Sequence, residues 1–255
     1  MTVLEFLLLV LAGVGAGLSG SIAGLASLIS YPALLATGVA PVTANVTNTV
    51  ALVLSSVGSV SASRPELRGQ RQRVLRLSVA ALLGGATGAA LLLLTPSSAF
   101  ERIVPWLIAA ASIAILVQPP PRQLAVEGMH LHRGRRDAWW LPPVTFAIGI
   151  YGGYFGAAAG VLMLATYLLA TGEGLPRSNA LKNVILGMAN AVAAVGYIFL
   201  SSIDWSAGIP LAIGLLGGGY LGPRVVRRAP QTALRRIIAV AGVGLAIRLG
   251  IQAYS

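Results

Sequence analysis

The sequence predicts an all-α, polytopic membrane protein built from two homologous halves with inverted topology. Three observations support this fold class. The 255 residues are 56% hydrophobic and 10% charged, whereas an ordinary soluble domain has about 25% charged residues. Apolar runs of helical length follow one another along the chain, and the glycine and polar patterns of the first half recur in the second. In water such a chain would expose much apolar surface, which a bilayer accepts.

Eight apolar runs are the predicted membrane elements, and most have the length of about 20 residues that spans a bilayer. They cover residues 6–40, 43–62, 74–94, 103–117, 139–171, 178–202, 206–225 and 237–252. The first and fifth runs are much longer, and as single helices they would reach about 50 Å, too long for a hydrocarbon core of about 30 Å. We therefore expect both to break. We also expect the first run to be retained, because Glu5 stands where a signal peptide has basic residues.

Glycines indicate where the two long runs break. The strings GLSGSIAG and GYFGAAAG share the spacing G-x-x-G-x-x-x-G at an offset of 136 residues. The glycines of this pattern are Gly17, Gly20 and Gly24 in the first run and Gly153, Gly156 and Gly160 in the fifth. This recurrence is the first sign of an internal repeat.

The rest of the repeat keeps an offset of 134 residues. LLATG at 34–38 recurs at 168–172. Single residues match in order as well: Asn45 with Asn179, Gly84 with Gly218, Gly88 with Gly222, Pro96 with Pro230, and Arg102 with Arg236. The sequence therefore predicts a first membrane repeat at 1–118, a polar cytoplasmic linker at 119–138 and a second membrane repeat at 139–255, together forming one membrane domain.

Charge at matched loops predicts that the repeats are inverted, because basic residues are retained on the cytoplasmic side. The loop after the second run holds Arg64, Arg68, Arg71, Arg73 and Arg76, whereas its counterpart SSIDWS holds no basic residue. The next pair of matched loops shows the reverse. The loop of the first half holds only Arg102, whereas the loop of the second half holds Arg224, Arg227, Arg228, Arg235 and Arg236. If matched loops lie on opposite sides of the membrane, each half must cross the membrane an odd number of times.

A fold-back of each overlong run satisfies this requirement. Each half then consists of a glycine-broken helical hairpin and three transmembrane helices. The linker, with Arg122, Arg133, Arg135 and Arg136, is expected in the cytoplasm together with Arg177 and Lys182. Asp204 and both termini are expected outside. The alternative, eight plain spans with parallel halves, would place one arginine-rich loop outside, against the usual charge bias.

Each half carries one polar stripe on a helix that follows the broken run. Asn45, Asn48, Thr49 and Ser56 recur as Asn179, Lys182, Asn183 and Asn190 at the same helical spacing. Polar stripes in apolar helices need protein or water partners. Broken helices also offer backbone N–H groups and a positive dipole end to an anion. The predicted substrate-binding residues are Gly20, Gly24, Asn45, Asn48, Thr49, Gly156, Gly160, Asn179, Lys182 and Asn183.

Two other interpretations of these residues remain open. The asparagines, serines and threonines could hydrogen-bond between helices while the glycines permit close packing. Lys182 could snorkel to the cytoplasmic interface, since it lies about four residues from the predicted helix start.

The remaining motifs point away from an enzyme and from metal or nucleic-acid binding. Net charge is +11, but the basic residues lie between apolar runs and no soluble basic domain holds nucleic acid. The chain has no cysteine, and His130 and His132 have no further ligands nearby, so we expect a solvated loop there and no metal site. No acidic residue occupies the middle of an apolar run. We expect no catalytic residues and no cofactor.

The chain resembles the TauE/SafE family of sulfite and organosulfonate exporters over nearly its whole length. The resemblance is strongest in GIYGGYFGAAAG, SNALKN and GLLGGGYLGPRVVRR, which contains LLGG-x-x-x-G at 215–222. It implies export of a small sulfur-containing anion, such as sulfite or an organosulfonate, across the bacterial plasma membrane.

The sequence therefore predicts a secondary transporter with alternating access around a site where the two halves meet, and its expected partners are a small anionic substrate and the lipid bilayer. A channel-like anion permease and a membrane assembly or scaffold protein are the two alternatives. The substrate, coupling ion and oligomeric state stay open, and a homodimer is one option.

Overall fold

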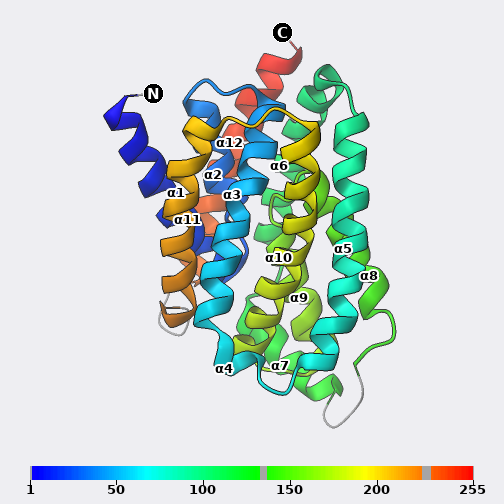
Figure 1. Ribbon diagram of the computed structural model, residues 1–255. Coiled ribbons are helices and arrows are strands. Elements are labelled where there is room, and N and C mark those ends of the chain that lie inside the picture. Colours follow the sequence, from blue (N-terminus) through cyan, green and yellow to red (C-terminus); the bar gives the residue numbers. More distant parts are fainter. Residues whose placement is uncertain (1, 133–136, 226–230, 255) are drawn as a thin grey trace.

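Figure 1 shows the computed structural model, which describes residues 2–132, 137–225 and 231–254. Within these residues every regular element is a helix, so the all-α prediction is confirmed. In chain order the described helices are α1 (Val3–Ala23), α2 (Ser27–Ala36), α3 (Pro41–Ala62), α4 (Arg64–Leu67), α5 (Arg71–Leu94), α6 (Ser97–Val117), α7 (Pro121–His132), α8 (Leu141–Tyr154), α9 (Ala159–Thr171), α10 (Leu175–Leu200), α11 (Trp205–Val225) and α12 (Gln231–Tyr254).

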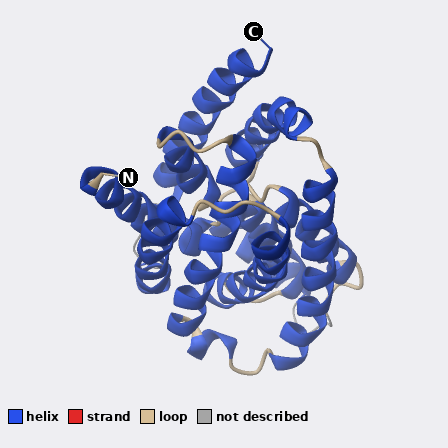
Figure 2. Ribbon diagram, turned by 45° about the horizontal axis from the view of Figure 1, so that its top comes forward, coloured by secondary structure: helices blue, strands red, loops and turns tan. Residues whose placement is uncertain are grey.

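The long helices form one bundle, with α4 and α7 at its lower end and both chain termini at its upper end (Figure 1). The tilted view in Figure 2 shows helices joined by short loops, with the terminal helices projecting from the rim. The largest cluster of buried apolar side chains draws on both halves of the chain, including Leu25, Leu52, Phe155 and Leu215. The two halves therefore share one core.

Both overlong apolar runs are broken within the glycine-rich segments. The first is interrupted between α1 and α2, where Gly24 ends α1 in the left-handed region at φ 79°. The fifth is interrupted between α8 and α9, where Gly156 has φ 74°. A φ in this region favours glycine because it has no Cβ. At about 15–20 Å, α2 and α9 are too short to cross a bilayer alone.

Other helix limits differ from the predicted runs for a common reason. Helix α6 begins at Ser97, ahead of the predicted 103, and includes Glu101 and Arg102. The linker contains the helix α7, which packs against α9. Hydropathy detects only the apolar part of a helix and misses polar helical turns outside the hydrocarbon region. The linker residues Arg133, Arg135 and Arg136, as well as Arg227 and Arg228, lie outside the described residues, as does the side chain of Arg235.

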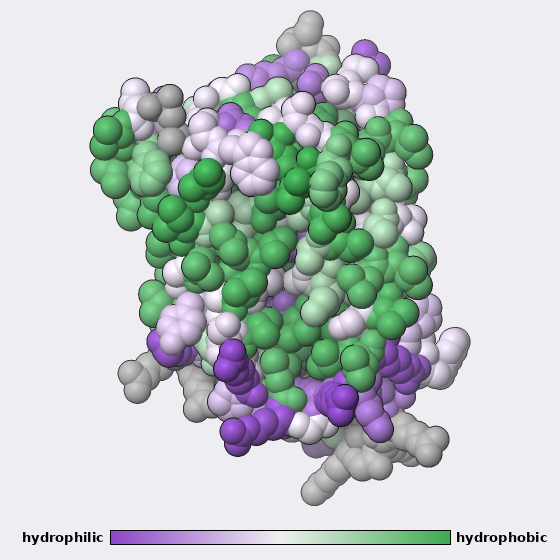
Figure 3. Space-filling model, in the orientation of Figure 1, coloured by the Kyte–Doolittle hydropathy of each residue, from purple (hydrophilic) through white to green (hydrophobic). Residues whose placement is uncertain are grey.

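Among the described residues, five helical stretches are long and apolar enough to cross a membrane. They are Val3–Ala23, Arg71–Leu94, Ser97–Val117, Leu175–Leu200 and Arg236–Ala253. Helices α3 and α11 have similar length, but α3 carries a polar face and α11 is rich in glycine. The space-filling view shows a broad hydrophobic band between two more hydrophilic ends (Figure 3). The protein is therefore a multi-pass membrane protein.

Glycines let the hairpins approach helices of the other half of the chain. Helix α1 packs against α11, where a Cβ on Gly17 would lie only 2.6 Å from the Leu215 carbonyl oxygen. Helix α8 packs against α5, where a Cβ on Gly153 would lie 3.0 Å from Gly85 Cα. Such small-residue contacts are typical of helix pairs in membranes. Each hairpin is thus held by a helix from the opposite half.

Candidate functional site

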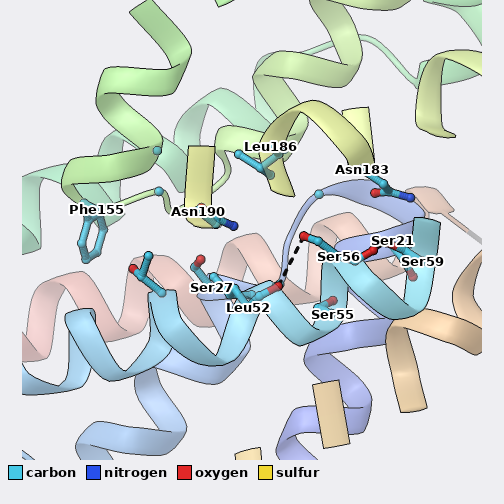
Figure 4. Close-up of a pocket in the computed structure, with 17 residues that line it drawn as sticks. Ser21, Ser27, Leu52, Ser55, Ser56, Ser59, Phe155, Asn183, Leu186 and Asn190 are labelled. Carbon is cyan, nitrogen blue, oxygen red and sulfur yellow. Dashed lines mark hydrogen bonds between the residues drawn. The ribbon is translucent and has the colours of Figure 1, made fainter. Parts of the chain in front are cut away.

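A small cavity lies where the two helix breaks meet α3 and α10 (Figure 4). It offers about 40 Å³ to the centres of water-sized molecules, which is room for a few waters or a small ion. Its walls are formed by Gly20, Ser21, Gly24, Ala26, Ser27, Thr49, Leu52, Ser55, Ser56, Ser59, Gly152, Phe155, Gly156, Gly160, Asn183, Leu186 and Asn190. Among these described wall residues none carries a carboxylate.

Matched positions of α3 and α10 face the cavity together. Thr49, Leu52 and Ser56 on α3 correspond by the offset of 134 residues to Asn183, Leu186 and Asn190 on α10. All six line the cavity, and the spacing i, i+3, i+7 places each set on one helix face. The two walls differ elsewhere, because Ser55 and Ser59 of α3 correspond to alanines on α10. The cavity is therefore more polar on its α3 side.

The tips of the two hairpins touch each other at glycine backbones beside this cavity. A Cβ added to Gly160 would lie 2.6 Å from Gly24 Cα, and a Cβ added to Gly24 would overlap the Gly160 backbone. Only glycine permits this approach. The contact brings the beginnings of α2 and α9 to the same cavity.

The beginnings of these two helices present positive ends to the cavity. The first backbone N–H groups of a helix have no acceptor within the helix, and the helix dipole adds a partial positive charge there. Ala26 and Ser27 at the start of α2 and Gly160 at the start of α9 line the cavity. Such an arrangement favours an anion.

The ends of α1 and α8, which carry the opposite partial charge, are each capped by an asparagine of the other half, and α8 also by Tyr197 of its own half. Asn179 Nδ2 donates to the Ser21 carbonyl oxygen at 2.7 Å. Its counterpart Asn45 Nδ2 donates to the Tyr154 carbonyl oxygen at 2.9 Å. Tyr197 Oη donates to the Gly153 carbonyl oxygen. These donors satisfy carbonyl groups that the helix breaks leave without partners.

Lys182 takes part in the same capping of α1. Its side chain is 1% exposed, and its Nζ lies 2.8 Å from the Gly20 carbonyl oxygen and 3.5 Å from that of Ser21. The ammonium thus lies directly behind two residues of the cavity wall. It does not snorkel to the cytoplasmic interface in this structure.

The structure divides the ten predicted site residues into two groups. The first lines the cavity and consists of Gly20, Gly24, Thr49, Gly156, Gly160 and Asn183. The second lies behind the wall and consists of Asn45, Asn48, Asn179 and Lys182. Thr49 Oγ1 donates to the Asn45 carbonyl oxygen at 2.9 Å, so its hydroxyl proton is already engaged.

Asn183 is a wall residue with a buried side-chain donor. Its side-chain Nδ2 is buried and has no partner among the described residues, and the residue is 6% exposed. Figure 4 shows its amide on the α10 side of the cavity. A buried donor without a partner is costly. A small anion in the cavity would satisfy it.

Sequence reasoning missed several polar wall residues. Ser55 and Ser59 continue the α3 face that already holds Leu52 and Ser56, so helical periodicity alone could have found them. Ser21 and Ser27 come from the first hairpin, and no pattern in the sequence pointed to them.

An aromatic cluster borders the cavity at Phe155. Phe155 lines the cavity and packs edge-on against Tyr31, with ring centroids 5.4 Å apart. Phe100 lies 6.1 Å from Phe155, centroid to centroid. All three side chains are buried. They form an aromatic plug beside the polar walls.

An ion-pair network ties the two halves together at the opposite end. Arg73 of α5 forms a bidentate pair with Asp137, at 2.6 and 2.7 Å, and contacts Glu173 at 3.1 Å. Arg177 Nε lies 2.6 Å from Glu173 Oε2. Glu173 therefore belongs to a partly buried network.

Among the described residues no group of three metal-ligating side chains occurs. His130 lies exposed on α7, so it belongs to a helix and not to the expected loop. The side chain of His132 lies outside the described part.

Comparison with known proteins identifies the class that this fold and cavity represent. The family model described as "Sulfite exporter TauE/SafE" matches residues 9–249. The chain belongs to the TauE/SafE family and is a membrane transporter of that family.

Its curated relatives are bacterial. The probable membrane transporter protein YfcA of Escherichia coli K12 is 26% identical over 92% of this chain and 85% of its own length. A probable membrane transporter protein of Haemophilus influenzae is 29% identical over 86% of this chain and 84% of its own. The probable membrane transporter protein ORF9 of Sinorhizobium sp is 26% identical, covering 92% and 88%. No solved structure matches this chain.

Proposed function

We propose that this chain is a secondary transporter that exports a small sulfur-containing anion, such as sulfite or an organosulfonate, across the bacterial plasma membrane. Access alternates around the cavity between the two hairpins. The family description names sulfite export, and all three relatives described above come from bacteria. The bilayer and the anion are the proposed partners.

The proposal includes two inverted repeats, at 1–118 and 139–255, joined by a cytoplasmic linker at 119–138. Equivalent helices make equivalent contacts, because α1 packs on α11 as α8 packs on α5, and α3 packs on α10. Helix α1 begins at the upper end of the bundle, whereas α8 follows α7 from the lower end (Figure 1). The arginine-rich segment around α4 and the linker helix α7 lie at the same lower end, which is the expected cytoplasmic side.

One observation supports an anionic substrate most directly. Asn183, whose side-chain Nδ2 has no partner among the described residues, lines a cavity whose described walls carry two helix beginnings and no carboxylate. Amide and hydroxyl donors together with helix beginnings are the groups that hold oxyanions in water-poor sites. The small volume suits sulfite or the sulfonate head of a larger molecule.

Alternating access needs barriers that open in turn on the two sides. The aromatic plug of Tyr31, Phe100 and Phe155 is the proposed outer barrier. The Arg73 network is the proposed inner barrier, since it links α5 to Asp137 of the linker and to Glu173 between α9 and α10 of the second half. Each barrier joins elements of different halves, so rocking of one half against the other would open one barrier and keep the other closed.

The test is ligand binding followed by flux. The purified protein is heated with sulfite, sulfoacetate, thiosulfate, sulfate and simple carboxylates, because a ligand that binds only the folded state raises its melting temperature. We expect sulfite or a sulfonate to stabilise the protein and the carboxylates to have little effect. Stabilisation by none of these anions would contradict the proposal and favour a scaffold role.

Flux in proteoliposomes separates the transporter from a channel. A transporter gives saturable uptake, and anion loaded inside the vesicles accelerates uptake of labelled anion from outside. A channel with the same cavity would give flux without this counterflow.

A further inference from the structure

Lys182 is a buried basic side chain without an anionic partner among the described residues. Its side chain is 1% exposed on α10, a helix long and apolar enough to cross the membrane. Within the described part of the chain, its hydrogen-bond acceptors are the carbonyl oxygens of Gly20 and Ser21. The ion pairs of the described residues do not include it. Buried charges in proteins are usually paired, because an unpaired one is costly.

Among the described residues, the other titratable groups on the helices around α10 form no hydrogen bond or ion pair with Lys182. On the helices that pack against α10 the described ones are Glu5 on α1, Arg64 and Glu66 on α4, Arg71, Arg73 and Arg76 on α5, Arg122, Glu127 and His130 on α7, Tyr151 and Tyr154 on α8, and Tyr167 on α9; α10 itself adds Arg177 and Tyr197. Helix α3 carries none. No contact of Lys182 Nζ with any of these groups occurs in the structure.

The position of Lys182 links its charge to the cavity. The two carbonyl groups that it contacts belong to Gly20 and Ser21, both of which form the cavity wall. Its neighbour Asn183 supplies the free donor on the same wall. An anion in the cavity is therefore the one counter-charge that the described site can offer to Lys182.

We propose that Lys182 couples anion binding to proton uptake, so that anion and proton cross the membrane together. This inference rests on the proposed function. A bound anion favours the ammonium over the neutral amine of Lys182, and linkage then requires that protonation favours anion binding equally. Water on the side to which the cavity is open supplies the proton, and the amine returns it to water on the other side after the anion leaves.

Lys182 thereby serves as the proton-binding group of the transporter, a role for which the sequence analysis named no residue. A carboxylate relay was hard to place because no acidic residue lies within an apolar run. A lysine can supply the same linkage with the opposite charge change. In the loaded site the ammonium of Lys182 and the bound anion then neutralise each other. In the empty site the neutral amine of Lys182 leaves no isolated cation within the membrane.

The experiment counts protons during anion binding. Calorimetric titrations with thiosulfate and sulfoacetate, which both stay fully ionised near neutral pH, are run in buffers of different ionisation enthalpy. We expect the binding heat to vary with the buffer in the sense of proton uptake. We also expect the affinity to fall up to tenfold for each unit of pH in the range where the empty site has lost its proton.

Two variants test the assignment to this residue. In Lys182→Arg the charge is kept but the side chain does not release its proton, so we expect binding without buffer dependence. In Lys182→Met we expect weaker binding, also without proton uptake. If either variant fails to fold, the buffer dependence of the unchanged protein still decides whether a proton is taken up.

The outcomes separate this inference from the proposed function. Binding of thiosulfate or sulfoacetate by the unchanged protein without proton uptake at any pH overturns the coupling and leaves the transporter in place. Proton uptake that persists in Lys182→Arg assigns the coupling to another group. If no anion of the panel binds, the proposed function fails, and the coupling with it.

Discussion

Asn183 is the side chain whose loss should affect the substrate more than the fold. Its Nδ2 has no partner among the described residues, so its removal breaks none of the hydrogen bonds seen in that part of the empty protein. A hydrogen bond to a charged group contributes about 1.5–3 kcal/mol. We expect Asn183→Ala to weaken anion binding about tenfold or more with little change in melting temperature, as measured by thermal titration.

A matched variant at another buried donor makes this prediction specific. Ser78 Oγ is also buried without a partner, but Ser78 does not line the cavity. Ser78→Ala should leave anion affinity unchanged. Equal affinities of Asn183→Ala and the unchanged protein would remove Asn183 from the site.

Asp204 should give the stability a measurable acid dependence. Its Oδ1 accepts hydrogen bonds from Ser206 Oγ at 2.5 Å and from the Ala207 N–H at 3.1 Å, which cap the start of α11. The hydrogen bond from Ser206, with those from the backbone, lowers the pKa of this carboxyl below its ordinary value of 3.8. A carboxyl whose pKa is lowered by folding stabilises the fold at pH values above its ordinary pKa. This contribution is lost as the pH falls through the pKa of the carboxyl in the folded protein.

Two substitutions separate the cap from its charge. Asp204→Ala should cost about 1 kcal/mol of folding free energy at neutral pH. Asp204→Asn keeps a good cap and should retain most of the stability while removing the acid dependence. Melting temperatures between pH 3 and 7 measure both, and an identical acid response in Asp204→Asn would assign it to other carboxyls.

At the residue scale, the sequence identified residues that line the cavity better than it identified residues that cap the helix ends. Matched offsets and helical spacing identified Thr49 and Asn183, because both signals are local. The role of Asn179 depends on the Ser21 carbonyl oxygen, 158 residues away, and no local pattern encodes such a contact. The polar stripes therefore serve two purposes, and only the structure assigns each residue to one of them.

At the scale of elements, the contact between the hairpin tips should be the position least tolerant of a side chain. Gly24 has φ 79°, and its Cβ would overlap the backbone of Gly160. Left-handed strain and overpacking each cost about 1–3 kcal/mol. We expect Gly24→Ala to lower the melting temperature strongly and to abolish anion binding, because the helix beginnings would separate.

A glycine in open space provides the control for this change. Gly217 lies in α11, and a Cβ there would meet nothing within 4 Å. Gly217→Ala should be neutral or stabilise the helix by up to about 1 kcal/mol. A similar loss of stability in Gly24→Ala and Gly217→Ala would show that the contact between the hairpin tips is not the cause of the loss.

The hairpins themselves were predictable from length and glycine spacing together. A run of 35 residues cannot cross a bilayer as one straight helix, and glycine marks the place where the chain can turn. The helix α7 was not predictable in this way, because its polar residues give no apolar run and it lies among residues interpreted as a linker.

At the scale of the whole molecule, the two halves cannot act as separate domains. Each hairpin packs on a helix of the other half, and each helix end at the cavity is capped from the other half. Expression of 1–118 alone would leave the glycine face of α1 without α11. The cavity exists only when both halves are assembled, so a movement of one half against the other changes its access.

Topology is the property on which the whole arrangement depends, and it can be measured directly. The chain has no cysteine, so single cysteines introduced at exposed loop positions can be labelled without background. We expect Ser97→Cys and Ser202→Cys to react with a membrane-impermeant reagent from outside the cell. Their loops lie at the end of the bundle that carries both termini (Figure 1).

Arg68→Cys provides the comparison, because Arg68 lies beside α4 at the opposite end of the bundle. It should react only after the membrane is opened. This difference follows from an odd number of crossings in each half, with α1 and α2 contributing none together. Labelling of Ser202→Cys and Arg68→Cys from the same side would require a different number of crossings between them, and the two halves could then not enclose the cavity as inverted repeats.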